Sequence, residues 1–271
     1  MRAHERAELA AMSVISGKNE AQLAQLKIQD ADAYQQLAQT AALFPAAMQE
    51  SELGEIPEGW AVKNLSSLIS IVGGGTPNRS EPTFWNGEIP WFSVRDVPSS
   101  SDVFVVDTEE KITELGLKKS STKFLPVGAA IITARGTVGK LALVATPMCM
   151  NQSCYGIIGS EGIGQFFNYF NLREALSTLQ QNVHGAVFDT ITTKTFESYS
   201  TAFCGIGLTV QFDAVVAPLL KKIELNVREN ISLSQLRDSL LPKLLSGEIT
   251  LTDTTPPHPN PLPKGEGTGA C

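Results

Sequence analysis

Residues 209–247 read TVQFDAVVAPLLKKIELNVRENISLSQLRDSLLPKLLSG, and this run predicts one long amphipathic helix. At about 1.5 Å per residue, such a helix extends roughly 55 Å, which exceeds the diameter of a small domain. Thr209 is a suitable N-cap and Gly247 a suitable C-terminal stop. Pro218 and Pro242 are expected to kink the helix or to begin a new turn, because each lacks an amide donor. A helix of this reach needs a partner.

The apolar face of this helix repeats at alternating intervals of three and four residues, which is typical of a helix that packs along a partner helix. Polar residues near the middle of such a seam cost stability but fix its register. An ordinary surface helix packed on its own domain is the alternative, and the length of the segment favours the partner helix. The predicted partner-facing residues are Phe212, Val216, Leu219, Ile223, Asn226, Asn230, Leu233, Leu240 and Leu244.

Composition indicates a globular protein of one or two domains, because the chain has 271 residues and a hydrophobic fraction of 42%. No apolar run reaches the ~20 residues of a membrane span, and the N-terminus has no signal pattern. We therefore expect a cytoplasmic protein without membrane contact. The cysteines lack metal-ligand spacing, so we expect no metal site and free, mostly buried thiols at Cys149, Cys154, Cys204 and Cys271.

The net charge of -7 argues mildly against nucleic acid, because affinity for phosphates depends on Lys and Arg. A DNA-binding function therefore requires a local basic patch or a more basic partner.

The chain divides into four predicted segments. Residues 1–50 are rich in Ala, Gln and Glu and predict a helical segment, with one helical face over residues 19–44 that ends at Pro45; a frayed leader is the alternative. Residues 51–205 predict a mixed α/β (α+β) domain with a largely antiparallel sheet. Residues 206–250 form the long, coiled-coil-forming helix, and residues 251–271 are Pro- and Gly-rich and expected to be disordered. Within the domain, strands are expected at 67–72, 89–94, 129–133 and 140–144, and helices at 108–115 and 166–181.

Four loop clusters carry side chains that suit DNA. The first, GGGTPNRS at residues 73–80, has glycines that let the backbone approach a ligand closely. A tight loop between strands is the alternative. Its polar side chains are Thr76, Asn78, Arg79 and Ser80. The second, PWFSVRDV at residues 90–97, offers Ser93 and Arg95; the arginine either reads guanine or pairs with Asp96.

The third cluster, TARGTVGK at residues 133–140, fails the test for a phosphate loop. That motif requires glycine where Ala134 stands and a hydroxyl where Leu141 stands, so we do not expect nucleotide hydrolysis. Glycine turns instead present side chains suited to phosphate or base edges, namely Arg135, Thr137 and Lys140.

The fourth cluster, MNQSCYG at residues 150–156, presents Asn151, Gln152 and Ser153. Asn and Gln amides can address adenine through a donor and an acceptor at once, and an amide network that supports a turn is the alternative. A weaker site combines His184 and Lys194, which would touch the DNA backbone, although a lone histidine is more often structural.

These motifs closely resemble those of type I restriction-modification specificity subunits over about residues 50 to 250. The matching phrases are LGEIPEGW (53–60), GGGTPNRS (73–80), FWNGEIPW (84–91), TARGTVGK (133–140), NQS (151–153), APLLKKIE (217–224) and LRDSLLPKLLSGEI (236–249). The resemblance implies a non-catalytic subunit whose target recognition domain reads one half of a split site in double-stranded DNA, and whose spacer helix docks the modification (methyltransferase) subunits. It implies no cofactor on this chain, because S-adenosylmethionine and ATP are expected on the modification and restriction subunits.

The chain departs from the family pattern in one respect. A full-size subunit has two recognition domains and two antiparallel spacer helices, whereas this chain has one of each. The resemblance therefore implies a half-size subunit, natural or left by a truncated gene, that pairs with a second copy or with a second half-subunit. A truncated helical assembly protein that no longer reads DNA is the alternative. An enzyme would need a reactive group of side chains, for example Asp96 near Arg95 or Cys154 near His184, and no spacing supports either pair.

Overall fold

The computed structural model describes residues 3–99, 102–182 and 190–249. His184, Cys271 and the tail expected to be disordered lie outside these residues. The chain divides into two compact units, Met1–Val227 and Arg228–Cys271. None of the helices in the described ranges has the length and apolarity needed to cross a membrane.

The chain begins with three helices, α1 (Ala3–Ser16), α2 (Glu20–Gln29) and α3 (Ala31–Ala41), which share a small core around Met12, Leu23 and Ala41. The prediction of one helical face running to Pro45 was wrong in its continuity and its end. The Asp30 side chain accepts the Ala33 N–H at 2.9 Å and so starts a new helix, because a short polar N-cap satisfies the free amides of a first turn.

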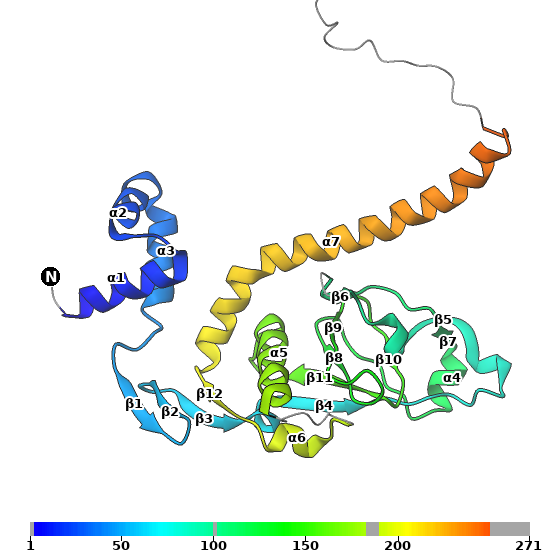
Figure 1. The fold of residues 1–271 in the computed structure, drawn as a ribbon, viewed down its shortest axis with the longest axis horizontal. Helices are drawn as coiled ribbons and strands as arrows, with labels where there is room; N and C mark the ends of the chain where they lie inside the picture. Colours follow the sequence, from blue (N-terminus) through cyan, green and yellow to red (C-terminus); the bar gives the residue numbers. More distant parts are fainter. Residues whose placement is uncertain (1–2, 100–101, 183–189, 250–271) are drawn as a thin grey trace, which may run out of the picture. The chain divides into compact units, whose positions relative to one another are not determined.

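The central sheet has the strand order β4 (Ile69–Gly73), β11 (Cys154–Gly159), β8 (Ala130–Thr133), β9 (Leu141–Val144) and β6 (Phe104–Val105). Its neighbours are antiparallel except for the parallel pair β6 and β9. Helix α5 (Gln165–Asn182) lies against this sheet (Figure 1). The main hydrophobic core includes Ile132 and Leu143 of the sheet with Phe166 and Leu172 of the helix.

A second sheet has the order β10 (Cys149–Met150), β5 (Trp85–Phe92) and β7 (Lys111–Ile112). Two antiparallel pairs complete the domain, β1 (Met48–Ser51) with β2 (Gly54–Pro57), and β3 (Ala61–Asn64) with β12 (Ser200–Phe203). The short helices are α4 (Glu114–Lys118) and α6 (Thr193–Glu197). The structure therefore confirms the mixed α/β fold with largely antiparallel sheets and a long helix after them.

The helix expected at residues 108–115 was wrong. Residues 111–112 instead form strand β7 against β5, and α4 begins only at Glu114. The Thr108 hydroxyl donates to the Glu110 carbonyl at 2.7 Å, and the same carbonyl accepts the Trp91 N–H at 3.0 Å. Pairing with a distant strand thus overrides the local helical pattern.

Helix α7 (Ile206–Leu245) is 40 residues long and passes through Pro218 and Pro242 without interruption, so neither proline begins a new helix. Thr209 is not the N-cap: the helix starts three residues earlier, and the buried Thr209 hydroxyl donates to the Ile206 carbonyl at 2.8 Å. Gly247 follows the last turn with a φ of 75°, which confirms the predicted glycine stop.

The first half of α7 packs on its own domain. Leu220 is buried in the main core, and the Phe212 ring meets the rings of Phe167 and Phe170 edge to face at 5.9 and 5.6 Å. The Asp213 carboxylate accepts the N–H groups of Phe166 at 3.1 Å and Phe167 at 2.7 Å, and so caps the start of α5. The first half of α7 is therefore an ordinary helix packed on its own domain, which was the alternative to a partner helix.

The described cysteines are free thiols, as predicted. Burial raises the pKa of Cys149 to about 11 and that of Cys154 to about 12, and Cys204 is half-buried. A thiol with so high a pKa stays protonated at neutral pH, which removes Cys154 as a nucleophile. In the part of the chain that the structure covers, no cluster of His, Cys, Asp and Glu is arranged to hold a metal ion.

Candidate nucleic-acid interface

A turn at residues 150–153 gathers the loops that follow three strands. The Met150 carbonyl accepts the Gly75 N–H at 2.9 Å, the Asn151 N–H donates to the Phe92 carbonyl at 2.9 Å, and the Ser153 carbonyl accepts the Ala134 N–H at 2.7 Å. These bonds join the turn to the loops after β4, β5 and β8. All four clusters predicted from sequence therefore meet at one edge of the domain.

The glycines of the first loop pack against this turn. A methyl group on Gly74 would collide with the Asn151 carbonyl, and one on Gly75 would collide with Ser121 and lie 2.5 Å from the Thr122 nitrogen. A methyl group on Gly73 would meet open space. The absence of a side chain at Gly74 and Gly75 thus serves the close approach of the protein's own loops, which agrees with the alternative of a tight loop between strands.

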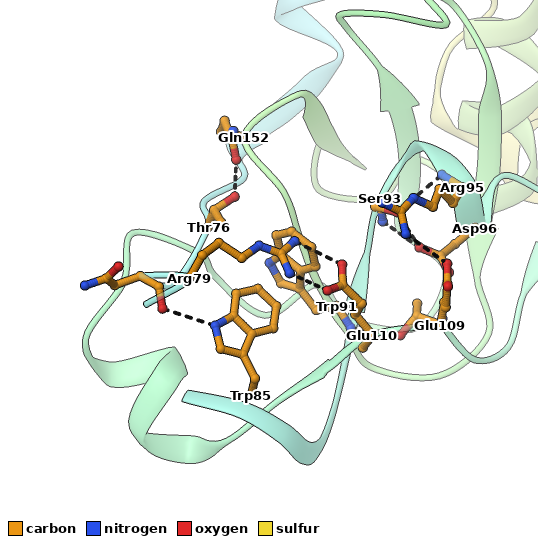
Figure 2. Close-up of polar contacts among 12 residues, drawn as sticks. Thr76, Arg79, Trp85, Trp91, Ser93, Arg95, Asp96, Glu109, Glu110 and Gln152 are labelled. Atoms are coloured by element: carbon orange, nitrogen blue, oxygen red, sulfur yellow. Dashed lines mark hydrogen bonds and ion pairs between the residues drawn. The ribbon is translucent and has the colours of Figure 1, made fainter. Parts of the chain in front are cut away.

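The Arg79 side chain contacts two tryptophan rings and one carboxylate, and it remains 52% exposed (Figure 2). Its guanidinium carbon lies 3.9 Å from the ring centre of Trp85 and 4.9 Å from that of Trp91, and both terminal nitrogens bond to Glu110, one of them at 3.0 Å. The hydrogen bond from Arg79 lowers the pKa of the Glu110 carboxyl. The two indoles also donate to the loop, Trp85 to the Asn78 carbonyl at 3.1 Å and Trp91 to the Gly75 carbonyl at 2.9 Å. Arg79 therefore fixes the loop through contacts with two indoles and an ion pair with Glu110.

The second loop presents Arg95 on a closed turn. Asp96 accepts from the Ser93 N–H at 2.8 Å, the Ser93 hydroxyl at 2.9 Å and the Glu109 N–H at 2.7 Å. The expected alternative of an Arg95–Asp96 pair does not occur, because Asp96 is used by these donors. Arg95 instead lies 3.5 Å from Glu109, and its side chain is 70% exposed. An exposed pair at this distance contributes little, so Arg95 remains available to a ligand.

The third loop closes on Thr133 and exposes its cationic residues. The Thr133 hydroxyl donates to the Thr137 carbonyl and accepts the Lys140 N–H at 3.0 Å. Arg135, Thr137 and Lys140 are exposed, and neither cation is paired with a carboxylate of the described residues. Lys140 borders a cleft of about 470 Å³ whose lining also includes Arg173 and Asp102.

The 150–153 turn has one outward amide. Asn151 accepts the Ser153 N–H through its side chain at 2.9 Å, which matches the alternative of an amide that supports a turn. Gln152 is exposed and its side-chain oxygen accepts the Thr76 hydroxyl (Figure 2). In the first loop, Asn78 likewise accepts the Ser80 N–H at 3.1 Å. Gln152 is therefore the member of this turn whose amide stands at the surface.

Lys194 is exposed at the start of α6, and Ile191 just before this helix donates its N–H to the Ala134 carbonyl at 3.0 Å. This hydrogen bond places the residues just before α6 next to the third loop.

Sequence reasoning missed a further loop beside the turn. The Thr122 hydroxyl donates to the Met150 carbonyl at 2.9 Å, which places residues 118–123 against the 150–153 turn. Their sequence, KKSSTK, carries three lysines and no acidic residue in an acidic chain, and this signal could have identified them.

The predicted partner-facing residues of α7 fall into two groups. Phe212, Val216 and Ile223 are half-buried against the main core of their own domain. The remaining ones are exposed, with Leu219 at 68% and Leu233 at 54%: Leu219, Asn226, Asn230, Leu233, Leu240 and Leu244.

Residues 57–201, more than half of the chain, match the family model described as "Type I restriction modification DNA specificity domain". The HindI type I restriction enzyme specificity subunit of Haemophilus influenzae is 32% identical over 253 residues, which cover 90% of this chain and 55% of that protein. The MjaIX specificity subunit of Methanocaldococcus jannaschii is 28% identical over 138 residues, which cover 51% of this chain and 32% of that protein. This chain thus spans about half the length of the first relative and a third of the second.

Among solved structures, the HsdS subunit from Thermoanaerobacter tengcongensis aligns with a TM-score of 0.46 and 16% identity. The alignment covers 91% of this chain and 59% of that one.

Proposed function

The chain belongs to the family of type I restriction modification DNA specificity domains, and from this membership we propose that it reads one half of a split target in double-stranded DNA. The observation that carries the proposal is the meeting of four polar loops at the 150–153 turn. Loops held by a rigid sheet can present several side chains to one stretch of a groove. The role we propose is non-catalytic and cytoplasmic, with methylation and cleavage performed by modification and restriction subunits that bind S-adenosylmethionine and ATP.

Within this edge, we assign different tasks to the predicted residues. The exposed Gln152 amide suits adenine, and Arg95 and Arg135 suit guanine or phosphate. Thr137, Lys140 and Lys194 are exposed and suit the DNA backbone. The others hold the loops in shape through the bonds described above, namely Thr76, Asn78, Arg79, Ser80, Ser93, Asn151 and Ser153.

Arg135→Ala is expected to weaken DNA binding about tenfold without changing thermal stability, because the side chain is exposed and unpaired among the described residues. Fluorescence anisotropy with labelled duplexes at several salt concentrations measures the loss. Lys63→Ala, which removes an exposed cation on β3, is the control. Unchanged affinity would remove Arg135 from the interface. Absence of salt-dependent binding by the unsubstituted chain would overturn the DNA-reading proposal and favour a helical assembly protein.

We also propose that α7 pairs antiparallel with a second copy of the chain. Because Phe212, Val216 and Ile223 face their own core, the free face is shifted from the predicted seam. At intervals of three and four residues along α7, this exposed stripe comprises Val215, Leu219, Lys222, Asn226, Glu229, Leu233, Leu236 and Leu240. Val215 and Leu219 are 56% and 68% exposed. Residues 229–249 are exposed throughout, and a helix without packing is marginal in water.

The stripe is complementary to itself when reversed. A two-fold axis between Asn226 and Glu229 sets Val215 opposite Leu240, and Leu219 opposite Leu236, of the second copy. The same axis brings Asn226 to Glu229 and Lys222 to Leu233, so polar side chains near the middle of the stripe would fix the register. At the start of the stripe, an apolar cavity of about 280 Å³ borders Leu208 and Val215, where the C-terminal leucines of the second copy would arrive. A second half-subunit or a modification subunit would use the same stripe.

Leu240→Asp is expected to convert a dimer to a monomer, because its carboxylate would lie unpaired against Val215 of the second copy. Light scattering of the purified chain measures the mass. Gln235→Asp adds the same charge on the opposite side of the helix and should leave the dimer intact. A monomeric unsubstituted chain would overturn self-pairing, and equal loss with both variants would show that the stripe is not the interface.

A further inference from the structure

Residues 118–123, which are the last residue of α4 and the loop that follows it, form a basic loop that is firmly attached to the candidate interface. Thr122 is 5% exposed, and its hydroxyl donates to the Met150 carbonyl at 2.9 Å and accepts the Met150 N–H at 3.4 Å. Just after the loop, Leu125 donates its N–H to the Met148 carbonyl at 2.8 Å. Before it, the Thr113 N–H donates to the Phe84 carbonyl at 3.0 Å, and the Thr113 side chain caps α4. The chain is thus anchored before the loop, within it and just after it.

The same loop packs against the glycine loop. A methyl group on Gly75 would come within 2.5 Å of the Thr122 nitrogen, so the two backbones are in contact at this point. The loop therefore lies beside both the 73–80 loop and the 150–153 turn.

The lysines of this loop differ in their charge environment from other cations near the interface. Arg79, Arg95 and Lys111 each lie within ion-pair distance of a carboxylate. Lys118, Lys119 and Lys123 are exposed, and no carboxylate of the described residues lies within 4.0 Å of their ammonium groups. In a chain with a net charge of -7, these lysines make a local positive patch that internal pairs do not neutralise.

We propose that Lys118, Lys119 and Lys123 hold the phosphate backbone of duplex DNA while the 150–153 turn faces the bases. The inference rests on the proposed DNA-reading function and supplies the local basic patch that an acidic DNA-binding protein requires. Lysine suits this task because its ammonium group is a flexible point charge, which binds phosphate without distinguishing base sequence. The buried Thr122 anchor fixes the position of the loop relative to the turn.

The test replaces the three lysines by glutamine in the full chain, as Lys118→Gln, Lys119→Gln and Lys123→Gln together. The matched control removes the same charge elsewhere through Lys27→Gln, Lys63→Gln and Lys221→Gln, all at exposed positions outside the stripe of α7. Anisotropy titrations with two unrelated labelled duplexes at a series of potassium chloride concentrations measure affinity and its salt dependence. Thermal melting of both variants checks that each is folded.

Each phosphate contact contributes about -0.9 to the slope of log affinity against log salt. The slope of the loop variant should therefore be shallower by about 2 to 3 than that of the unsubstituted chain. Its affinity should fall equally for both duplexes, because phosphate contacts carry no sequence information. The control should keep the slope of the unsubstituted chain. A full slope in the loop variant, or an equal reduction in the control, would overturn the proposal while the DNA-reading function stands. An unequal loss between the duplexes would show that the lysines read bases. No binding by the unsubstituted chain would instead overturn the proposed function on which the inference rests.

Discussion

Gly74→Ala is expected to lower the free energy of unfolding by roughly 3 kcal/mol, because the new methyl group would overlap the Asn151 carbonyl. Backbone, unlike the end of a flexible side chain, cannot move aside without breaking other bonds. The 150–153 turn would have to shift, and with it the Gly75, Phe92 and Ala134 contacts that gather the loops. DNA binding should therefore fall together with stability.

Gly73→Ala is the matched control, because its methyl group would meet no atom within 4 Å. Its free energy of unfolding should change by less than about 1 kcal/mol, since an open position adds no collision and alanine restricts the unfolded chain. Urea titrations followed by tryptophan fluorescence measure both variants. Equal stability of the two variants would contradict the close packing of Gly74 on the turn.

Trp91→Ala is expected to cost about 3–5 kcal/mol of stability, because it empties the space of a large side chain in a closed core. Trp91 is 2% exposed, and its ring lies edge to face with Trp85 at 5.1 Å. The substitution also removes the indole that donates to the Gly75 carbonyl and contacts the Arg79 guanidinium. Chemical denaturation measures the cost.

A second pair of variants separates the hydrogen bond from the packing. Trp91→Phe keeps an aromatic ring but leaves the Gly75 carbonyl without its indole donor, at a cost of about 1–3 kcal/mol. Trp85→Phe removes the bond to the Asn78 carbonyl at the exposed end of the loop, where water can replace it, so its cost should be smaller. An equal cost for both would show that the buried bond to Gly75 does not anchor the loop.

Strand positions were predictable where the apolar run was buried on both faces. Ala130–Thr133 and Leu141–Val144 appear as strands because runs of β-branched and apolar residues suit the interior of a sheet. The short strand Lys111–Ile112 was not predictable, since nothing local distinguishes it from the first turn of a helix. Its conformation follows from pairing with β5.

The candidate site shows the same division. The polar clusters were visible in the sequence because Gly, Asn, Ser and Arg stand out between apolar runs. Their tasks were not visible: Arg79 is engaged by Glu110 and two indoles, while Arg135 is exposed on its loop. The lysines at 118–123 were overlooked because tertiary contacts, such as the Thr122 bond to Met150, bring them to the interface.

The sequence by itself determined the family, the mixed α/β fold and the long helix that ends before Gly247, because long motifs, apolar periodicity and a glycine stop are local properties of the chain. Only the tertiary structure decided which side of α7 is free. Phe212, Val216 and Ile223 repeat at the spacing of a partner seam, yet they pack on the core of their own domain. Periodicity identifies an apolar face but not its partner, because intramolecular and intermolecular burial remove the same surface from water.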